Sequence, residues 1–308
     1  MVAAGPKTQP LRNRKVRWTQ RLAPVWFIGP ALLVLIGLVA FPLGFSVFHS
    51  LQHWDLELGP LPLQFVGLSN YGAVLTSPLF WAGVKFTLEF VAVVVTTELV
   101  LGTGIALLLD QKIPGVHLAR ALIILPTAVA PVVAGFMFRY MLYPGTGIIP
   151  YVAHLLGVHL PAAGILGSST WAPIGVEMTN VWQWTPFMAL VILAGLQAVP
   201  QEIIEAARVD GASNVQTYRH IIFPNLRFIM AVALIIRIMQ AFNVFSPVYA
   251  ETKGGPGIAT TSLSYLLYQN GLLYYNLGLA FAMGWLVILI AATLVNIYIS
   301  LAFRGIKL

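Results

Sequence analysis

The sequence offers little of the chemistry that an enzyme needs. It contains no cysteine, which excludes a thiolate nucleophile, a disulfide framework and a cysteine-based zinc site. No G-x-x-x-x-G-K-[ST] segment is present, so the chain has no phosphate loop of its own. His49, His53 and Asp55 have metal-ligand spacing, but they fall where an apolar run ends, and a polar cap at a membrane surface explains them better. We therefore expect no catalytic residue and no metal site.

Charged residues inside apolar runs are the more informative feature. Arg237 and Glu98 each lie near the middle of such a run. An unpaired charge in hydrocarbon costs at least about 2.5 kcal/mol, so each needs a partner or a watery cavity. Two hypotheses stay open: Glu98 and Arg237 form a structural pair, or Arg237 faces a transport pathway. Lys85 and Glu89 are four residues apart on one helical face and are expected to neutralise each other.

The composition identifies lipid as the solvent. Of 308 residues, 58% are hydrophobic and 9% are charged, whereas soluble domains carry about 25% charged residues. About 20 apolar residues in a helix cross the roughly 30 Å hydrocarbon core. Six runs are long enough, and we predict an all-α polytopic membrane protein with six transmembrane helices. They cover about residues 25–48, 81–109, 118–140, 174–199, 225–249 and 278–302.

The distribution of basic residues predicts the orientation. Most of the 17 Lys and Arg residues lie on one side of these spans, in the N-terminal tail, the loops at 110–120 and 200–227, and the C-terminal tail. The positive-inside rule then places both termini in the cytoplasm. We expect a basic cytoplasmic tail at residues 1–24 and one transmembrane domain at 25–308. The net charge of +7 therefore needs no nucleic-acid partner.

The longest predicted cytoplasmic loop, at about residues 200–224, is the most distinctive segment. It reads as two short helices joined at Gly211, a residue type that helix ends favour. Glu202 and Glu205 lie in the first turns, where carboxylates complement the helix dipole. We expect Pro224 to end the second helix and to start the fifth span.

This loop carries a resemblance to a known family. Glu205-Ala206-Ala207, then Gly211, Ile221 and Pro224 at the same spacing, resemble the EAA loop of ATP-binding-cassette (ABC) importer permeases. The usual leucine before the proline is Phe223 here. Flanking segments agree with the carbohydrate-uptake branch, whose best-known relatives are the maltose and glycerol-3-phosphate permease subunits. They are Trp182-Gln-Trp-Thr-Pro186, Ala194-Gly-Leu-Gln-Ala-Val-Pro200, Phe242-Asn-Val-Phe-Ser-Pro247 and Gly254-Gly-Pro256.

The resemblance implies a machine of several chains. Its fold would be that of a type I importer permease in the cell inner membrane. The expected partners are a second, non-identical permease subunit, two ATPase subunits that bind ATP and Mg²⁺, an extracellular or periplasmic solute-binding protein, a sugar or related polyol, and membrane lipid. This chain would hold no cofactor. The residues expected to couple it to the ATPase are Glu205, Ala206, Ala207, Asp210, Gly211, Ile221 and Pro224.

Prolines inside the spans suggest where substrate passes. Pro126 and Pro131 interrupt the third predicted span, Pro186 the fourth and Pro247 the outer part of the fifth. Each removes a backbone hydrogen bond, which is tolerated where the freed carbonyl is buried in protein or lines a watery cavity. A kink that serves only packing is the equal alternative for each proline taken alone.

Uncharged polar and aromatic side chains gather near these prolines. A neutral sugar needs paired donors and acceptors and flat apolar faces, which asparagine, glutamine and tryptophan provide without a charge to desolvate. Ordinary helix packing is the alternative for each aromatic residue. The candidate pathway residues are Asn180, Gln183, Trp184, Arg237, Gln240, Asn243, Phe245 and Ser246.

Two other classes of function remain to be compared with the permease. An ion-coupled secondary transporter would need carboxylates for a proton relay or an inverted repeat, and the spans show few of the former and none of the latter. A membrane enzyme would need a nucleophile and a base close together, and the sequence suggests no such group.

Overall fold

A computed structural model describes residues 18–62, 64–111 and 114–303. It divides the chain into two compact units, Met1–His49 and Ser50–Leu308. Several basic residues on which the predicted orientation depends lie outside the described residues. They are Lys7, Arg12, Arg14, Lys15, Arg17, Lys112, Arg304 and Lys307.

The first unit is helical. Helix α1 (Trp18–Leu35) continues through a π-helical turn, η1 (Ile36–Ala40), into α2 (Phe41–Ser50). From Phe27 to Ser50 this helix has 24 residues and a mean hydropathy of 2.5, enough to cross a membrane. Its apolar side chains are exposed, as a lipid-facing helix requires. The first predicted span is confirmed.

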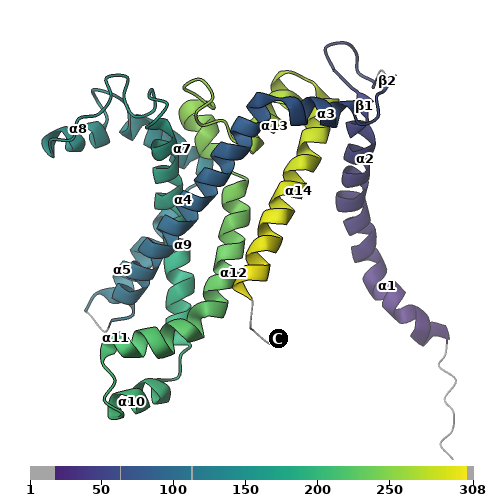
Figure 1. The fold of residues 1–308 in the computed structure, drawn as a ribbon. Coiled ribbons are helices and arrows are strands. Elements are labelled where there is room, and N and C mark those ends of the chain that lie inside the picture. Colours follow the sequence, from purple (N-terminus) through teal and green to yellow (C-terminus); the bar gives the residue numbers. More distant parts are fainter. Residues whose placement is uncertain (1–17, 63, 112–113, 304–308) are drawn as a thin grey trace, which may run out of the picture. The chain divides into compact units, whose positions relative to one another are not determined.

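The second unit is a bundle of long helices. They are α4 (Pro78–Leu109), α9 (Ala172–Gln197), α12 (Phe223–Phe242) and α14 (Leu277–Ala302), with a short α3 (Ser69–Thr76) before α4. Figure 1 shows them side by side. Helices α4 and α9 approach closely at Gly102, where an added Cβ would lie 2.9 Å from the Cβ of Met188. A small residue at this point brings the two backbones together.

The third predicted span is broken. Helices α5 (Val116–Ile123) and α6 (Leu125–Ala128) are bent by 95° from α7 (Pro131–Met141). Val129 and Ala130 between them are extended, and Pro131 starts α7 in the first turn, where its missing N–H is not needed. The predicted interruption at Pro126 and Pro131 is therefore confirmed.

The fifth span differs from the prediction at both ends. Helix α11 (Asn214–Thr217) and the π-helical turn η2 (Tyr218–Ile222) run directly into α12, so Pro224 does not separate two helices. The wider turn, in which the Phe223 amide donates to the Tyr218 carbonyl, accommodates the proline. At the other end α12 stops at Phe242, not at 249.

The segment after α12 explains that early stop. Pro247 lies outside α12 and precedes the π-helical turn η3 (Val248–Thr252). Residues 243–245 are not helical, and a short helical stretch begins at Ser246 with Pro247 in its first turn, where the missing N–H of proline is not needed. The fifth predicted span is therefore interrupted just ahead of Pro247, as the third is just ahead of Pro131.

The two ends of the bundle are built differently. One end carries α10 (Gln201–Val209) and α11, together with the C-terminal end of α14 (Figure 1). The other carries α3, α13 (Leu263–Tyr268) with η4 (Gln269–Leu273), and α8 (Ile148–Leu155). A two-stranded antiparallel ribbon, β1 (Gln52–His53) with β2 (Gln64–Phe65), precedes α3.

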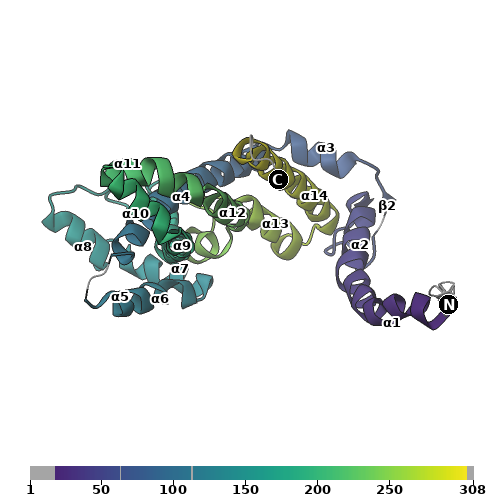
Figure 2. The ribbon, with the colours of Figure 1, turned by 90° about the horizontal axis from the view of Figure 1, so that it is seen from below.

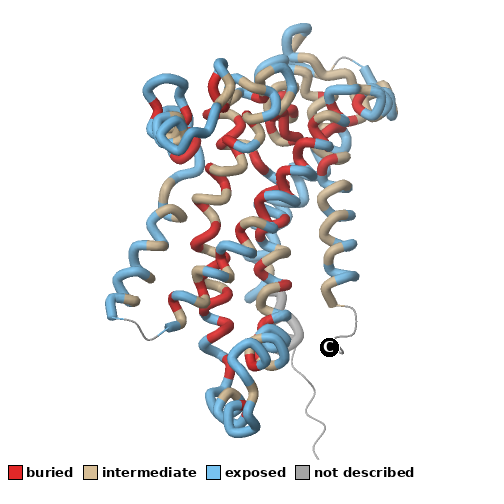
Figure 3. The backbone as a smooth tube through the Cα atoms, turned by 60° about the vertical axis from the view of Figure 1, so that its left-hand side comes forward, coloured by how far each residue is buried: buried red, intermediate tan, exposed pale blue. Residues whose placement is uncertain are grey.

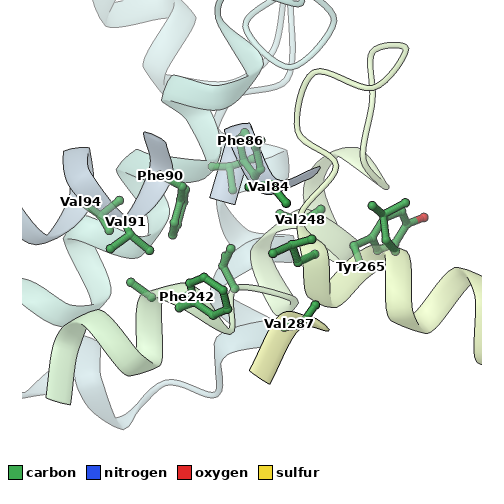
Figure 4. Packing of buried hydrophobic residues seen from close by; sticks show 14 of the residues in the cluster. Val84, Phe86, Phe90, Val91, Val94, Phe242, Val248, Tyr265 and Val287 are labelled. Atoms are coloured by element: carbon green, nitrogen blue, oxygen red, sulfur yellow. The ribbon is translucent and has the colours of Figure 1, made fainter. Parts of the chain in front are cut away.

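The core lies along the facing sides of the long helices. Figure 3 shows buried residues on these sides and exposed residues outside them. Phe90 and Val94 of α4 pack with Phe242 of α12, Val248 of η3 and Val287 of α14 (Figure 4). Within the described residues four helices are long and apolar enough to span a membrane, or up to six if each bent pair counts as one span. The predicted all-α membrane fold is confirmed.

Candidate functional site

A buried ionic network joins three helices. Arg237 of α12 donates from Nε and Nη2 to the two carboxylate oxygens of Glu98 on α4, at 2.7 Å each. Nη2 also donates to Asn180 Oδ1 on α9 at 3.0 Å, and Nη1 to Gln240 Oε1 at 2.8 Å. Arg237 and Glu98 are 0% exposed. The first sequence hypothesis, a structural pair, is therefore what the geometry shows.

The bidentate geometry of the pair offsets the cost of burying two charges inside the bundle. Two parallel charge-assisted hydrogen bonds neutralise both charges inside the bundle, and Asn180 and Gln240 use further guanidinium donors. Breaking a buried pair by removing one partner typically costs about 3–5 kcal/mol. The network therefore fixes α12 against α4 and α9.

The network reaches the protein surface through two uncharged side chains. Gln240 is exposed, although its Oε1 accepts from Arg237. The indole of Trp184 is partly exposed and lies 4.7 Å from the Arg237 guanidinium carbon, a cation–π distance. Trp184 also lines a hollow of about 280 Å³ with Thr127 of the broken third span and Phe187. The site therefore presents an amide and an aromatic face to the surface, and no charged group.

The other four predicted pathway residues lie elsewhere. Gln183 is buried and donates to the Val129 carbonyl at 2.6 Å, which satisfies backbone exposed by the break between α6 and α7. Asn243 donates to the Met239 carbonyl and lines a hollow between α12 and α14. Phe245 stacks with Tyr249 and packs against Tyr268. Ser246 lies just before η3 and is partly buried. The structure thus brings Asn180, Trp184, Arg237 and Gln240 together and leaves the remaining four apart.

The predicted hinge at Gly211 has a definite geometry. Gly211 has φ +81°, in the left-handed region. Its amide donates to the Arg208 carbonyl at 3.1 Å, and the Ala212 amide to the Ala207 carbonyl at 2.9 Å. This pair of bonds is a Schellman motif, which ends a helix and favours glycine at this position. The predicted helix end at Gly211 is confirmed, but only α10 is a separate short helix, because α11 continues into α12.

A second cap follows this turn, at the start of α11, and it was not predicted from the sequence. Ser213 Oγ accepts from the Gln216 amide, and Gln216 Oε1 accepts from the Ser213 amide at 2.8 Å. This capping box fixes the start of α11. The pattern Ser-x-x-Gln was visible in the sequence. Together the two caps impose a rigid corner between α10 and α11.

The corner presents one face to the bundle and one away from it. Ala207 is buried, and Ile204 packs against the cluster of Leu193, Leu196 and Ile222. The predicted coupling residues Glu205, Ala206, Asp210 and Gly211 are exposed, whereas Ile221 is partly buried and Pro224 exposed. Val209 is 88% exposed and Val215 75% exposed. Exposed valines beside carboxylates form a surface suited to another protein.

Glu251 is a buried acid that sequence reasoning did not single out. It lies in η3, is 5% exposed, and neither carboxylate oxygen has hydrogen-bond geometry with any described residue. Burial raises the pKa of Glu251 to about 8, and the hydroxyl of Thr179 offsets only part of that rise. Its carboxyl group is therefore largely protonated at neutral pH. No signal in the sequence separated it from an ordinary loop residue.

Taken together, the fold and the site define a membrane-embedded helical subunit with an exposed, doubly capped corner at one end and a charge-neutral polar site within. Residues 98–307 match the family described as the binding-protein-dependent transport system inner membrane component. The chain belongs to this family, which places it in the inner membrane as a multi-pass protein. It is a permease subunit of an ABC importer and not an enzyme.

Individual relatives are similar in sequence to this chain along nearly its whole length. The trehalose transport system permease protein SugA of Mycobacterium tuberculosis is 34% identical over 92% of this chain and 90% of its own. The trehalose/maltose transport system permease protein MalF of Thermococcus litoralis is 36% identical over 86% of this chain and 87% of its own. The predicted resemblance to carbohydrate-uptake permeases is confirmed.

A solved structure agrees on the fold. The crystal structure of a bacterial ABC transporter involved in the import of the acidic polysaccharide alginate matches with a TM-score of 0.79. It covers 94% of this chain and 100% of the matched chain at 19% identity. The predicted type I importer fold is confirmed, and the ion-coupled and enzymatic alternatives are set aside.

Proposed function

We propose that this permease carries a neutral sugar or related polyol into the cell by alternating access. The observation that carries this is the complete pairing of Arg237 with Glu98, which leaves Gln240 and Trp184 as the groups that reach the surface. A carboxamide and an indole suit a ring with hydroxyl edges and an apolar face. The named substrates of SugA and MalF, trehalose and maltose, have this chemistry.

In this proposal the side chains have distinct roles. Gln240 bonds sugar hydroxyls through its free amide donors, because its carbonyl oxygen accepts from Arg237. Trp184 offers one face to the sugar and keeps the other toward Arg237. Arg237, Glu98 and Asn180 position these two groups and do not touch substrate. Asn243, Phe245 and Ser246 stay pathway candidates on the side of α12 nearer η3.

The exposed corner at residues 201–216 would couple transport to ATP hydrolysis. Its Schellman turn and capping box make α10 and α11 move as one body. Because α11 continues through η2 into α12, a push on the corner would reach Arg237 and Gln240 along a single helix. We assign the docking role to Glu205, Ala206, Asp210 and Val209. Ala207 would hold the corner to the bundle, Gly211 would form its turn, and Ile221 and Pro224 would belong to the helix that transmits its movement.

The complete importer requires partners. A separate pair of ATPase subunits would bind ATP and Mg²⁺ on the cytoplasmic side, where the corner and both termini would lie. A second, related permease subunit would complete the pathway. A periplasmic solute-binding protein would deliver the sugar at the opposite end. One solved relative is an alginate transporter in complex with a periplasmic protein bound to an alginate pentasaccharide.

Uptake by the reconstituted complex tests the proposal. The complex, purified through a tag on this chain, is placed in proteoliposomes with its binding protein outside and ATP inside. We expect ATP-dependent accumulation of a radiolabelled disaccharide such as trehalose. Uptake driven by an ion gradient without ATP would contradict the mechanism. Uptake of amino acids but not of sugars would contradict the substrate class.

A further inference from the structure

The segment between α7 and α9 has an unusual composition. From Tyr140 to Val176 the sequence contains no Asp, Glu, Lys or Arg. A loop that faces water on a membrane protein rarely lacks charge over such a length, because charged groups are the most frequent surface residues. The segment instead combines apolar residues with tyrosine, glycine and proline.

Within it, α8 exposes a continuous apolar stripe. Ile148, Tyr151, Val152 and Leu155 are 52%, 61%, 43% and 65% exposed. Their spacing of three and four residues places them on one side of the helix. Ile149, about 100° around the helix from Ile148, packs against the cluster of Phe138, Leu142 and Ile165. The stripe therefore is not the face that holds α8 to the protein.

The position of α8 agrees with this division. It follows α7 and precedes α9, so it lies where two membrane-crossing helices reach the same side of the bilayer. Figure 1 shows it crosswise to the long helices, at the end of the bundle opposite α10, and Figure 2 shows it at the edge of the bundle. Tyr140, near the end of α7, is 75% exposed as well.

The polar groups of the segment lie on another side. His154 and His159 line a hollow of about 460 Å³ together with Pro144, Pro150 and Pro161. The exposed stripe contains neither histidine. Tyrosines at 143 and 151 are residues that favour the boundary between headgroups and acyl chains.

We infer that α8 is an interfacial helix whose stripe, Ile148, Tyr151, Val152 and Leu155, is embedded in the lipid leaflet at this end of the bundle. The uncharged, apolar stripe and the crosswise orientation of α8 at the end of the bundle fit a lipid partner. The helix would anchor the broken third span at the membrane surface.

Collision accessibility of spin labels tests this inference. The chain has no cysteine, so Tyr151→Cys and Leu155→Cys can be labelled singly in the full chain, within a complex whose partners have been freed of cysteine. The complex is placed in vesicles of phosphatidylethanolamine and phosphatidylglycerol. Oxygen concentrates in the bilayer and a water-soluble nickel chelate stays outside. His154→Cys, on the same helix but outside the stripe, is the matched control.

The outcomes separate lipid from protein and from water. We expect strong relaxation by oxygen and weak relaxation by nickel at positions 151 and 155, with the reverse preference at 154. Weak relaxation by both reagents at 151 and 155 would mean that protein covers the stripe and would overturn the inference. Strong relaxation by nickel at these positions, or protection that begins only when the binding protein is added, would overturn it as well.

Discussion

The guanidinium of Arg237 and the carboxylate of Glu98 form two parallel hydrogen bonds of 2.7 Å, although 139 positions separate them in the sequence. This pair joins α12, which continues from the exposed corner, to α4 in the centre of the bundle. The same two side chains hold the helices together and orient Gln240 and Trp184.

Removing one charge of this pair should destabilise the protein strongly. Glu98→Gln leaves the Arg237 cation buried without a counter-charge, and we expect a loss of about 3–5 kcal/mol. Lys85→Ala is the control, because the 3.8 Å Lys85–Glu89 pair is exposed and such pairs contribute about 0–1 kcal/mol. Thermal unfolding of the purified complex measures both.

A double substitution separates the effect of one unpaired buried charge from the effect of losing the ion pair as a whole. Glu98→Leu with Arg237→Met removes both charges, so the complex should be markedly more stable than the Glu98→Gln variant. If Glu98→Gln unfolds at the same temperature as Lys85→Ala, the pair does not carry the structural role given to it here.

Gln240→Ala should weaken sugar transport without unfolding the protein. Gln240 is exposed, and Arg237 keeps its bonds to Glu98 and Asn180 in the variant. Loss of one or two hydrogen bonds to sugar should raise the apparent KM of uptake by about 2- to 10-fold. Thr293→Ala is the control, since Thr293 is an exposed polar residue on α14 whose hydroxyl donates to the Leu289 carbonyl of its own helix. An equal effect of both substitutions would remove Gln240 from the pathway.

Glu251 should make stability depend on pH. Its pKa is raised to about 8 in the folded chain, above the ordinary value of 4.5, so the folded state binds more protons between these values. Stability should therefore fall as pH rises from about 5 to 8 and change little from this group at higher pH. Glu251→Gln should flatten that slope and stabilise the complex at pH 8. A slope that persists unchanged in the variant would assign the pH dependence to other groups.

The predicted orientation can be tested by cysteine labelling. Ser69→Cys should react with an impermeant maleimide from outside the cell, and Asn214→Cys only after the membrane is permeabilised. Ser69 is a better site than its neighbour Asn70, whose side chain bonds the Ser50 and Gln52 carbonyls. The opposite labelling pattern would invert the positive-inside assignment.

Much of this fold was predictable from the sequence, because few backbone structures can span a lipid bilayer. Apolar run length predicted the spans. Similar depth in two runs made a pair between Arg237 and Glu98 one of two open hypotheses, and only the structure decided between them. Gly211 predicted a helix end because the left-handed conformation is costly for other residues. The family pattern predicted the importer fold.

Other features depended on tertiary context. A proline usually starts a helix, yet the π-helical turn at Tyr218–Ile222 lets the helix run through Pro224. The amide of Gln183 looked like a substrate ligand, but it binds the Val129 carbonyl exposed by the break in the third span. Burial of Glu251 follows from the packing of η3 against the bundle, which its own sequence does not reveal.

The corner at Gly211 is the part of the account on which the importer mechanism depends. An added Cβ at Gly211 would meet no atom within 4 Å, so a substitution acts through the backbone alone. Gly211→Val should cost about 1–2 kcal/mol at φ +81° and distort the corner. Gly211→Asn is the matched control, because asparagine tolerates this conformation. Glu205→Lys should also impair coupling, because it reverses the charge of an exposed side chain on the proposed docking face.

The decisive measurement is ATP hydrolysis by the reconstituted complex, with and without sugar-loaded binding protein. In Gly211→Val and Glu205→Lys we expect normal insertion and assembly, retained basal hydrolysis, and a sharp loss both of stimulation by the binding protein and of uptake. Gly211→Asn should keep most of the stimulation. Wild-type stimulation and uptake in the Gly211→Val and Glu205→Lys variants would show that residues 201–216 do not couple ATP hydrolysis to transport.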